Sequence, residues 1–185
     1  MARRAIFNDK LPRPAGPYSP GIAWDRLVFT AGQVAGNPAG FLVLSEVPDA
    51  ETLWLISTGT GLAPFLAILR TEAPWKRFKD VVVVHAVRYA NELTYRELIH
   101  KTAARYVTFV SRENAPGSLA GRIPAAITDG RLERAAGLAL SPETSHVMLC
   151  GNPQMLRDAT AALMARGMRK HRRRTPGHIT VESFW

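Results

Sequence analysis

The sequence predicts an α/β fold in which a mainly parallel, Rossmann-like sheet is flanked by helices. Two observations support this fold: the apolar character of the predicted strands, and their alternation with helical segments. From about residue 51, apolar runs typical of strands buried on both faces alternate with helical segments, and such alternation implies right-handed βαβ crossovers. The first 40 residues differ, because they hold five prolines and five glycines. We therefore expect a short β-containing segment over 1–40 and one α/β domain over 41–185.

The expected elements follow in chain order. The opening segment should hold a strand over 26–30, with a second short strand over 41–44. Strands are then predicted over 52–57, 81–86, 106–111, 145–150 and 178–184, and helices over 63–70, 91–104, 123–128 and 153–166. Pro64 falls in a first helical turn, where its missing N–H does no harm, and Asn91 is expected to cap its helix. Such sheets bind ligands at the carboxyl ends of their strands, so the residues just after each strand are the candidates for function.

Composition narrows the class of protein. The chain has 185 residues, a formal net charge of +9 and one cysteine, Cys150. No apolar run approaches the length of a membrane span, and no apolar stretch follows the basic N-terminus as in a signal peptide. A single cysteine permits no disulfide within the chain, which fits the cytoplasm. The positive charge favours acidic partners, such as nucleotide phosphates, an acidic protein or a nucleic acid.

Much of the positive charge stands in the run Arg169-Lys170-His171-Arg172-Arg173-Arg174. We interpret this run as a solvated helix end, where cations interact favourably with the helix dipole. The alternative is a nucleic-acid surface, but no aromatic residues are interleaved with the run to stack on bases.

The turn after the strand over 52–57 is a candidate phosphate site. It reads Ser57-Thr58-Gly59-Thr60-Gly61-Leu62-Ala63-Pro64. Its glycines permit positive φ and close approach of the backbone to a phosphate, and the helix behind it offers N–H groups at its N-terminus. The third glycine of the dinucleotide-binding fingerprint is absent. Taken alone, the turn therefore fits an ordinary strand-to-helix connection equally well.

Three arginines occupy similar positions after the next strands. Arg88 follows the strand over 81–86, Arg112 follows the strand over 106–111, and Arg122 stands at the start of the helix over 123–128. The planar guanidinium group suits phosphate, and an arginine at this edge of a Rossmann sheet accommodates the 2′-phosphate of NADP. Each arginine alone fits a plain surface cation; their shared placement favours NADP.

The single cysteine and the histidines carry less information. Cys150 ends a predicted buried strand and is followed by Gly151-Asn152-Pro153. A lone cysteine at such a place is usually a small core residue, and no neighbouring pattern supplies the base that a nucleophile needs. The five histidines lack the spacing of metal ligands, so no metal site is expected.

Residues from about 40 to 185 closely resemble the NADP-binding domain of bacterial ferredoxin/flavodoxin–NADP reductases. The matching segments are 51–64, 85–89, 110–113, 121–124, 144–155 and the ending from Arg172 to Trp185. Between Leu98 and Val110 the chain is shorter than this family, so a helix or its loop should be trimmed. The resemblance implies that NADPH passes a hydride to FAD, and that single electrons then go to ferredoxin or flavodoxin.

The resemblance also implies roles for single residues. The pyrophosphate and nicotinamide would meet Thr58, Gly59, Thr60, Gly61, Leu62, Ala63 and Pro64. The side of the cofactor that carries the 2′-phosphate would meet Arg88, Arg112 and Arg122. The hydride-transfer site would be bordered by Cys150, Gly151, Asn152, Pro153 and Met155. Cys150 and the final aromatic residue, Trp185, would be the catalytic residues, with Trp185 against the flavin.

The first 40 residues do not match the flavin-binding β-barrel of this family or its Arg-x-Tyr-Ser motif. They resemble instead the start of Rid (YjgF-type) enamine/imine deaminases, through the segments 16–20, 27–33 and 37–40. We therefore expect a reductase that is truncated or fused and inactive without the FAD domain. A homo-oligomer is also expected, because the missing barrel would leave apolar surface exposed.

Three further interpretations stay open. The chain could be an NADP(H)-binding module without activity, a Rid-like deaminase, or a chimera with no function of its own. The sequence does not distinguish a natural fusion, laboratory recombination and an error in the gene model as the origin of the joined segments.

Overall fold

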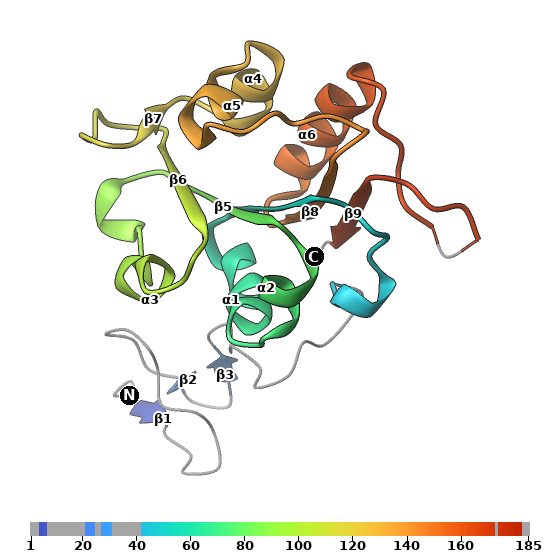
Figure 1. Ribbon diagram of the computed structural model, residues 1–185. Coiled ribbons are helices and arrows are strands. Elements are labelled where there is room, and N and C mark those ends of the chain that lie inside the picture. The colour runs from blue at the N-terminus through green and yellow to red at the C-terminus, as the bar shows by residue number, and fades with distance from the viewer. Residues whose placement is uncertain (1–3, 7–20, 25–26, 31–41, 173, 183–185) are drawn as a thin grey trace.

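The main part of the structure is a six-stranded parallel sheet between two layers of helices (Figure 1). The computed structural model describes residues 4–6, 21–24, 27–30, 42–172 and 174–182. The sheet has the strand order β7-β6-β5-β4-β8-β9, and every neighbouring pair is parallel. Its strands are β4 (Thr52–Thr58), β5 (Asp80–Val87), β6 (Arg105–Val110), β7 (Leu119–Ala120), β8 (Ser145–Cys150) and β9 (Ile179–Glu182). The expected Rossmann-like α/β fold is thus confirmed.

Helices cover both faces of this sheet, as right-handed crossovers require. One face carries α4 (Ile123–Thr128), α5 (Arg131–Ala136) and α6 (Pro153–Ala165), and the other carries α1 (Ala63–Leu69), α2 (Ala73–Arg77) and α3 (Arg96–His100) (Figure 1). Three short 3₁₀ turns complete the connections: η1 (Leu44–Glu46), η2 (Gly59–Leu62) and η3 (Ala90–Glu92). No helix in the described part of the chain is long and apolar enough to cross a membrane.

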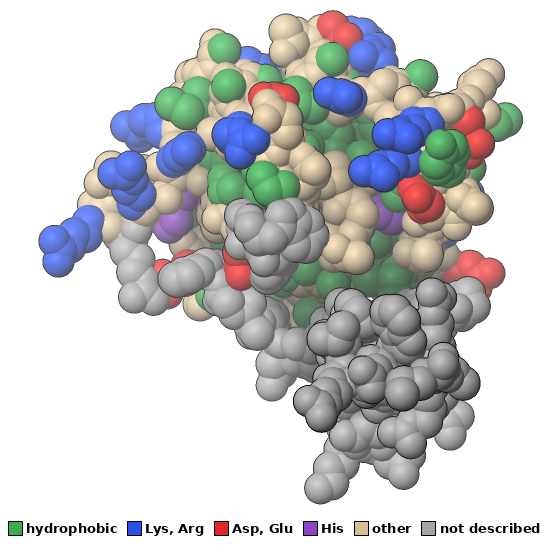
Figure 2. Space-filling view, turned by 180° about the vertical axis from the view of Figure 1, so that it is seen from behind, with side chains coloured by type: hydrophobic (Ala, Val, Ile, Leu, Met, Phe, Trp, Pro, Cys, Tyr) green, Lys and Arg blue, Asp and Glu red, His purple; other side chains and the backbone are tan. Residues whose placement is uncertain are grey.

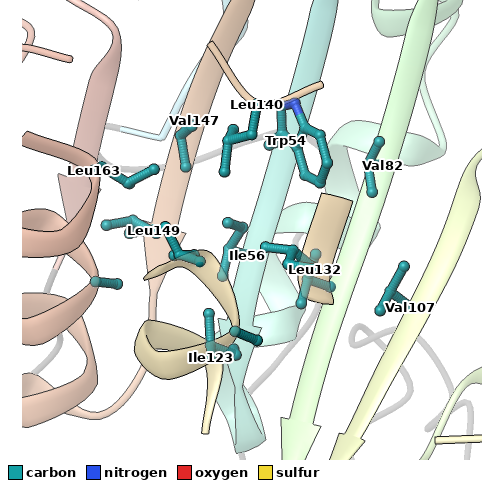
Figure 3. Packing of buried hydrophobic residues seen from close by; sticks show 14 of the residues in the cluster. Trp54, Ile56, Val82, Val107, Ile123, Leu132, Leu140, Val147, Leu149 and Leu163 are labelled. Carbon is teal, nitrogen blue, oxygen red and sulfur yellow. The ribbon is translucent and has the colours of Figure 1, made fainter. Parts of the chain in front are cut away.

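The central strands explain why the sheet forms. In β4, Leu53, Trp54, Leu55 and Ile56 are fully buried, because the strand meets helices on both faces. Figure 3 shows Trp54 and Ile56 beside Val147 and Leu149 of β8, on the face covered by α4 to α6. The Trp54 indole N–H is satisfied inside this core, since it donates to Ser145 Oγ at 3.3 Å.

The expected strands and helices are mostly confirmed. The helix over 123–128 and the strand over 145–150 have the predicted bounds, and the other strands of the large sheet agree within three residues. Five short helices and strands were not predicted: α2, α5, β7 and, near the N-terminus, β1 (Arg4–Ile6) and β2 (Gly21–Trp24). Two predictions were wrong. Residues 91–104 form the turn η3 and the five-residue α3 in place of one long helix, and Leu44 opens the turn η1 where a strand was expected.

The N-terminal segment contains a small antiparallel sheet of β1 (Arg4–Ile6), β2 (Gly21–Trp24) and β3 (Leu27–Thr30). The strand predicted over 26–30 corresponds to β3. The Rid-like segments 16–20 and 37–40 lie outside the described residues.

The basic run is not a helix end, and that expectation was wrong. α6 ends at Ala165 with no basic residue in its last turn. The described residues of the run lie instead on a projecting segment, residues 169–172 and 174–178, which we call the basic hairpin (Figure 1). Its two sides are joined by hydrogen bonds from His178 N to Arg169 O at 2.7 Å and from Arg172 N to Thr175 O at 3.0 Å. A Cβ at Gly177 would lie 2.5 Å from Lys170 O, so only glycine permits this close pairing.

Candidate functional site

The strand order reverses between β4 and β8, and the candidate site lies there. From β4 the chain adds β5, β6 and β7 on one side, and it then returns to place β8 on the other. In open α/β sheets, ligands bind at such a switch point, outside the carboxyl ends of the strands. β4 ends here at Thr58 and β8 at Cys150.

Two glycines let the loops after β4 and β8 touch. A Cβ at Gly61 would lie 2.4 Å from Cys150 O, and a Cβ at Gly151 would lie 2.2 Å from Thr58 Oγ1. Neither position accepts a side chain, and Gly151 has φ of +135°, a conformation that favours glycine. The backbone of Asn152 donates to Thr58 Oγ1 at 2.8 Å and closes the contact. The two loops, residues 58–61 and 150–152, therefore form one surface of main chain and small side chains, which we call the cradle.

Asn152 also begins α6. Its Oδ1 accepts from the backbone N–H groups of Gln154 and Met155 at 2.9 and 3.2 Å, which is an N-cap. Pro153 takes the first helical position, where a missing N–H does no harm. The site is therefore built on a rigid helix start and a buried strand end.

Not every predicted residue of the cradle faces outward. Gly59 and Thr60 are exposed and Thr58 is half-buried. Leu62 and Met155, in contrast, belong to the two hydrophobic cores on opposite faces of the sheet. Ala63 and Pro64 form the first turn of α1 and are half-buried.

The predicted arginines follow three neighbouring strands. Arg88 comes directly after β5, and Arg112 comes one residue after Ser111 at the end of β6. Their backbones are adjacent, because Arg112 N donates to Arg88 O at 2.9 Å. Arg122 occupies the N-cap position of α4, just beyond β7, without a capping hydrogen bond from its side chain. All three side chains are exposed, and no hydrogen bond or ion pair of their guanidinium groups is found within the described residues.

Two carboxylates shape the loop around Arg88. Glu92 Oε2 accepts from the N–H groups of Arg88 and Tyr89 at 2.8 and 3.1 Å. Glu113, next to Arg112, accepts from Ala90 N. The loop after β5 is thereby tied to the loop after β6, and Tyr89 is left 41% exposed beside Arg88.

Cys150 stands at the floor of the cradle and is fully buried. Burial, together with the nearby carboxylate of Glu182, raises the pKa of its thiol to about 12. The thiol is therefore protonated at neutral pH and is a poor nucleophile.

Glu182 is a residue of this site that sequence reasoning missed. It lies opposite Cys150 in the β8–β9 register, and its Oε2 accepts from Leu42 N at 2.9 Å. The sequence did contain a sign of this residue, because Glu182 is an acidic residue within the strand predicted over 178–184. The predicted catalytic residue Trp185 lies outside the described residues.

A second group of polar residues lies away from the cradle. A cavity of about 220 Å³ at the opposite edge of the sheet is lined by residues that include His146, Arg169 and His178, and it shares none with the cradle. The described residues contain no group of three or more side chains that could hold a metal ion.

Comparison with known proteins finds a family model and several relatives that match this chain. Residues 55–161 match the model of the oxidoreductase NAD-binding domain. The flavodoxin/ferredoxin–NADP reductases of Shigella flexneri and Escherichia coli (strain K12) are 54% and 52% identical to this chain over 160 residues. Each alignment covers 83% of this chain and 64% of the relative, so the chain spans less than two thirds of these relatives.

A solved structure gives a similar result. A ferredoxin NADP+ reductase from Neisseria gonorrhoeae, with bound FAD and NADP, superposes with a TM-score of 0.76 at 34% identity. The match covers 80% of this chain and 61% of that one.

Proposed function

This chain belongs to the oxidoreductase NAD-binding domain family, and we propose that it is the NADP(H)-binding part of a ferredoxin/flavodoxin–NADP reductase. In this proposal residues 41–185 form the nucleotide-binding domain. The observation that carries it is the cradle at the switch point of the sheet, where Gly61 and Gly151 leave no room for a Cβ.

The cradle fits the pyrophosphate of a dinucleotide. An anion needs close approach to backbone N–H groups, and the exposed Gly59-Thr60 segment beside Thr58 offers this with no bulky side chain in the way. β6 lies three strand spacings from β8, or about 14 Å at about 4.8 Å per spacing. An extended dinucleotide with its pyrophosphate at the cradle therefore reaches the loops after β5 and β6.

The arginines support NADP over NAD. Arg88, Arg112 and Arg122 offer guanidinium groups that have no partner among the described residues, at the place where the adenosine end would lie. A doubly charged 2′-phosphate would be held by charge-assisted hydrogen bonds. NAD has no such phosphate, so it gains little from these residues.

At the other end of the cofactor, Cys150, Gly151, Asn152 and Glu182 would border the nicotinamide. The chemistry that NADPH and FAD supply when bound is hydride transfer, followed by release of single electrons to ferredoxin or flavodoxin. The Cys150 thiol contributes a neutral, water-excluding floor. Glu182 holds the chain at Leu42 beside that floor. Trp185 would cover the flavin.

The basic hairpin supports an acidic partner. Arg169, Lys170, Arg172 and Arg174 are exposed, and no ion pair joins them to an acidic side chain in the described part of the chain. Figure 2 shows Lys and Arg side chains projecting from this side of the molecule, at the left of the view. Such a cluster attracts an acidic electron carrier and accelerates its arrival at low salt.

Titration of the purified chain with NADP+ and NAD+ tests the cofactor assignment. We expect Arg88→Ala and Arg112→Ala each to weaken NADP+ binding by about tenfold, the value of one charge-assisted hydrogen bond, and to change NAD+ binding much less. Arg70→Ala is the matched control, because Arg70 is exposed and follows the far end of α1. Equal losses for both nucleotides would contradict the 2′-phosphate assignment.

Turnover tests the reductase activity itself. NADPH oxidation with flavodoxin or ferredoxin as acceptor, together with a flavin absorption spectrum, would show that this chain by itself carries out the reductase reaction. Saturable NADP+ binding without either signal would reduce the function to that of a nucleotide-binding module.

A further inference from the structure

The loop that carries Arg88 is anchored at both ends and lies at the surface between them. Val87 and Leu93 are buried, and they pack in a small core with Val110 of β6. Between these two anchors, Arg88 and Tyr89 are exposed. The position of the Arg88 side chain therefore depends on what holds the backbone of this short exposed stretch.

The carbonyl groups of this stretch are held by other backbone groups. The Arg88 carbonyl accepts from Arg112 N at 2.9 Å, and the Tyr89 carbonyl accepts from Glu92 N at 3.0 Å. In a planar trans peptide the carbonyl and the N–H point in opposite directions. The N–H groups of the same stretch therefore need partners from another side of the loop.

Two carboxylates bind three successive N–H groups of the loop. Glu92 Oε2 accepts from the N–H groups of Arg88 and Tyr89 at 2.8 and 3.1 Å. Glu113 Oε1, on the loop after β6, accepts from Ala90 N. Hydrogen bonds to an ionised acceptor are stronger than those between neutral groups, so these contacts are the ones that restrain the N–H side of the loop.

The charge of these carboxylates is unfavourable at an edge that binds phosphate, because like charges repel. Neither Glu92 nor Glu113 forms an ion pair with an arginine in the part of the chain that the structure describes. The two carboxylates therefore leave the guanidinium groups of Arg88 and Arg112 available to a ligand. Their hydrogen bonds, in contrast, go to the backbone that carries Arg88.

We propose that Glu92 and Glu113 are positioning residues, which hold the loop after β5 so that Arg88 is placed to bind the 2′-phosphate of NADP(H). The inference rests on the proposed function, since it assigns a role within the same nucleotide site. It differs from a plain charge effect in sign. A carboxylate that acted only through its charge would repel the phosphate, so its removal would tighten binding. A carboxylate that positions Arg88 has the opposite effect, so its removal weakens binding.

Titration of the full chain with NADP+, with 2′-AMP, which carries the 2′-phosphate, and with NAD+, which lacks it, tests this inference. We expect Glu92→Ala to weaken NADP+ and 2′-AMP binding by about three- to fivefold, because the freed Arg88 must then be ordered when the ligand binds. NAD+ binding should change by less than about twofold. Glu113→Ala should act in the same direction by about twofold, since it frees one N–H group instead of two.

Two further variants separate position from charge. Glu92→Gln keeps an oxygen that accepts both N–H groups but loses the charge, so it should bind 2′-AMP at least as tightly as the unaltered chain. Glu97→Ala is the matched control, because Glu97 is an exposed carboxylate in the first turn of the nearby α3. It should not weaken the binding of NADP+ or 2′-AMP, since its removal takes away only a negative charge.

The outcomes separate this inference from the proposed function. Failure of the unaltered chain to bind NADP+ would refute the proposed nucleotide site. Binding by the unaltered chain, with 2′-AMP affinity unchanged or increased in Glu92→Ala, would overturn the positioning role. Equal losses of NADP+ and NAD+ affinity in Glu92→Ala would overturn it as well, because they would indicate a general loss of structure. If Glu92→Ala does not fold, the other variants decide: weaker 2′-AMP binding in Glu92→Gln, or unchanged or tighter binding in Glu113→Ala, would refute the inference.

Discussion

Acidification from pH 7 to pH 5 should destabilise this fold through two buried histidines. Burial lowers the pKa of His85 to about 4 and that of His146 to about 3, and for His146 the charges of His171, His178 and Arg77 act in the same direction. Both side chains are 1% exposed. The unfolded chain holds histidines with pKa near 6.5. Between about pH 6.5 and pH 4 it therefore binds protons that the folded chain excludes.

The magnitude follows from the linkage between proton binding and folding. The free energy of unfolding falls as the pH falls through this window, by about 2 kcal/mol per histidine between pH 7 and pH 5. The two histidines together should lower it by about 4 kcal/mol, a large part of the stability of an ordinary domain. With a urea m-value of about 2 kcal/mol/M, the unfolding midpoint should fall by about 2 M.

Urea unfolding followed by tryptophan fluorescence at pH 7, 6 and 5 measures this shift. Trp54 is a suitable reporter because it lies fully buried in β4. His85→Gln and His146→Gln should each remove about half of the pH dependence, and His100→Gln serves as the exposed control. A midpoint that is unchanged between pH 7 and pH 5, or a slope that survives both substitutions, would refute the reasoning.

Three further predictions concern the cradle. Gly61→Ala places a Cβ against Cys150 O, so it should destabilise the fold by about 1–3 kcal/mol and weaken NADP+ binding. Gly117→Ala is the control for backbone strain, because a Cβ has space there but φ is +80°. Equal NADP+ affinities in the two variants would contradict the close-contact argument. Asn152→Ala removes the N-cap of α6 and should lower the free energy of unfolding by about 1 kcal/mol, whereas Asn152→Ser should retain most of it. The Cys150 thiol should react with a disulfide reagent at pH 8 only as fast as the protein unfolds, because it is buried with a pKa of about 12; rapid labelling in native buffer would show that the floor of the cradle is open.

The sequence was sufficient where one local signal dominated. β4 and β8 each have an apolar centre and are followed directly by glycine, so their positions could be predicted without tertiary information. Asn152-Pro153 is a helix start in which cap and first residue agree, and α6 begins there. The shared edge of Arg88 and Arg112 also followed directly, because parallel strands bring their carboxyl ends together.

The failures occurred where local propensity met a tertiary constraint. Residues 91–104 carry enough helix formers to predict one helix, but Leu93 turns inward to a small core and Tyr95 adopts φ of +60°, which restricts α3 to five residues. The basic run continued the pattern of α6 in sequence, yet Gly167, with φ of +87°, directs the chain out of the helix.

The residues that sequence reasoning missed are those whose partners depend on strand register. Glu182 meets Cys150 only because β9 pairs with β8 as it does, across 32 positions of the chain. His85 meets Tyr106 only because β5 and β6 are paired in the observed register. A shift of one residue would turn either side chain to the other face of the sheet, and composition or spacing alone does not specify register to that precision.

The two basic regions of the molecule should act independently of each other. The arginines follow the carboxyl ends of β5 and β6, whereas the basic hairpin leads into the start of β9 and so lies at the amino ends of the strands. Six residues of β8 separate these edges by about 20 Å, which exceeds the Debye length of about 8 Å at physiological salt.

Independence of the two regions has a measurable consequence. Arg172→Glu should weaken association with flavodoxin in a salt-dependent way and leave NADP+ affinity unchanged, while Arg112→Ala should do the reverse. The free-energy effects of the double variant should add, because distant sites without shared partners seldom couple. Non-additive losses of NADP+ affinity would mean that the basic hairpin and the edge with Arg88 and Arg112 are coupled. Flavodoxin would then have to be assigned to the same surface as NADP+.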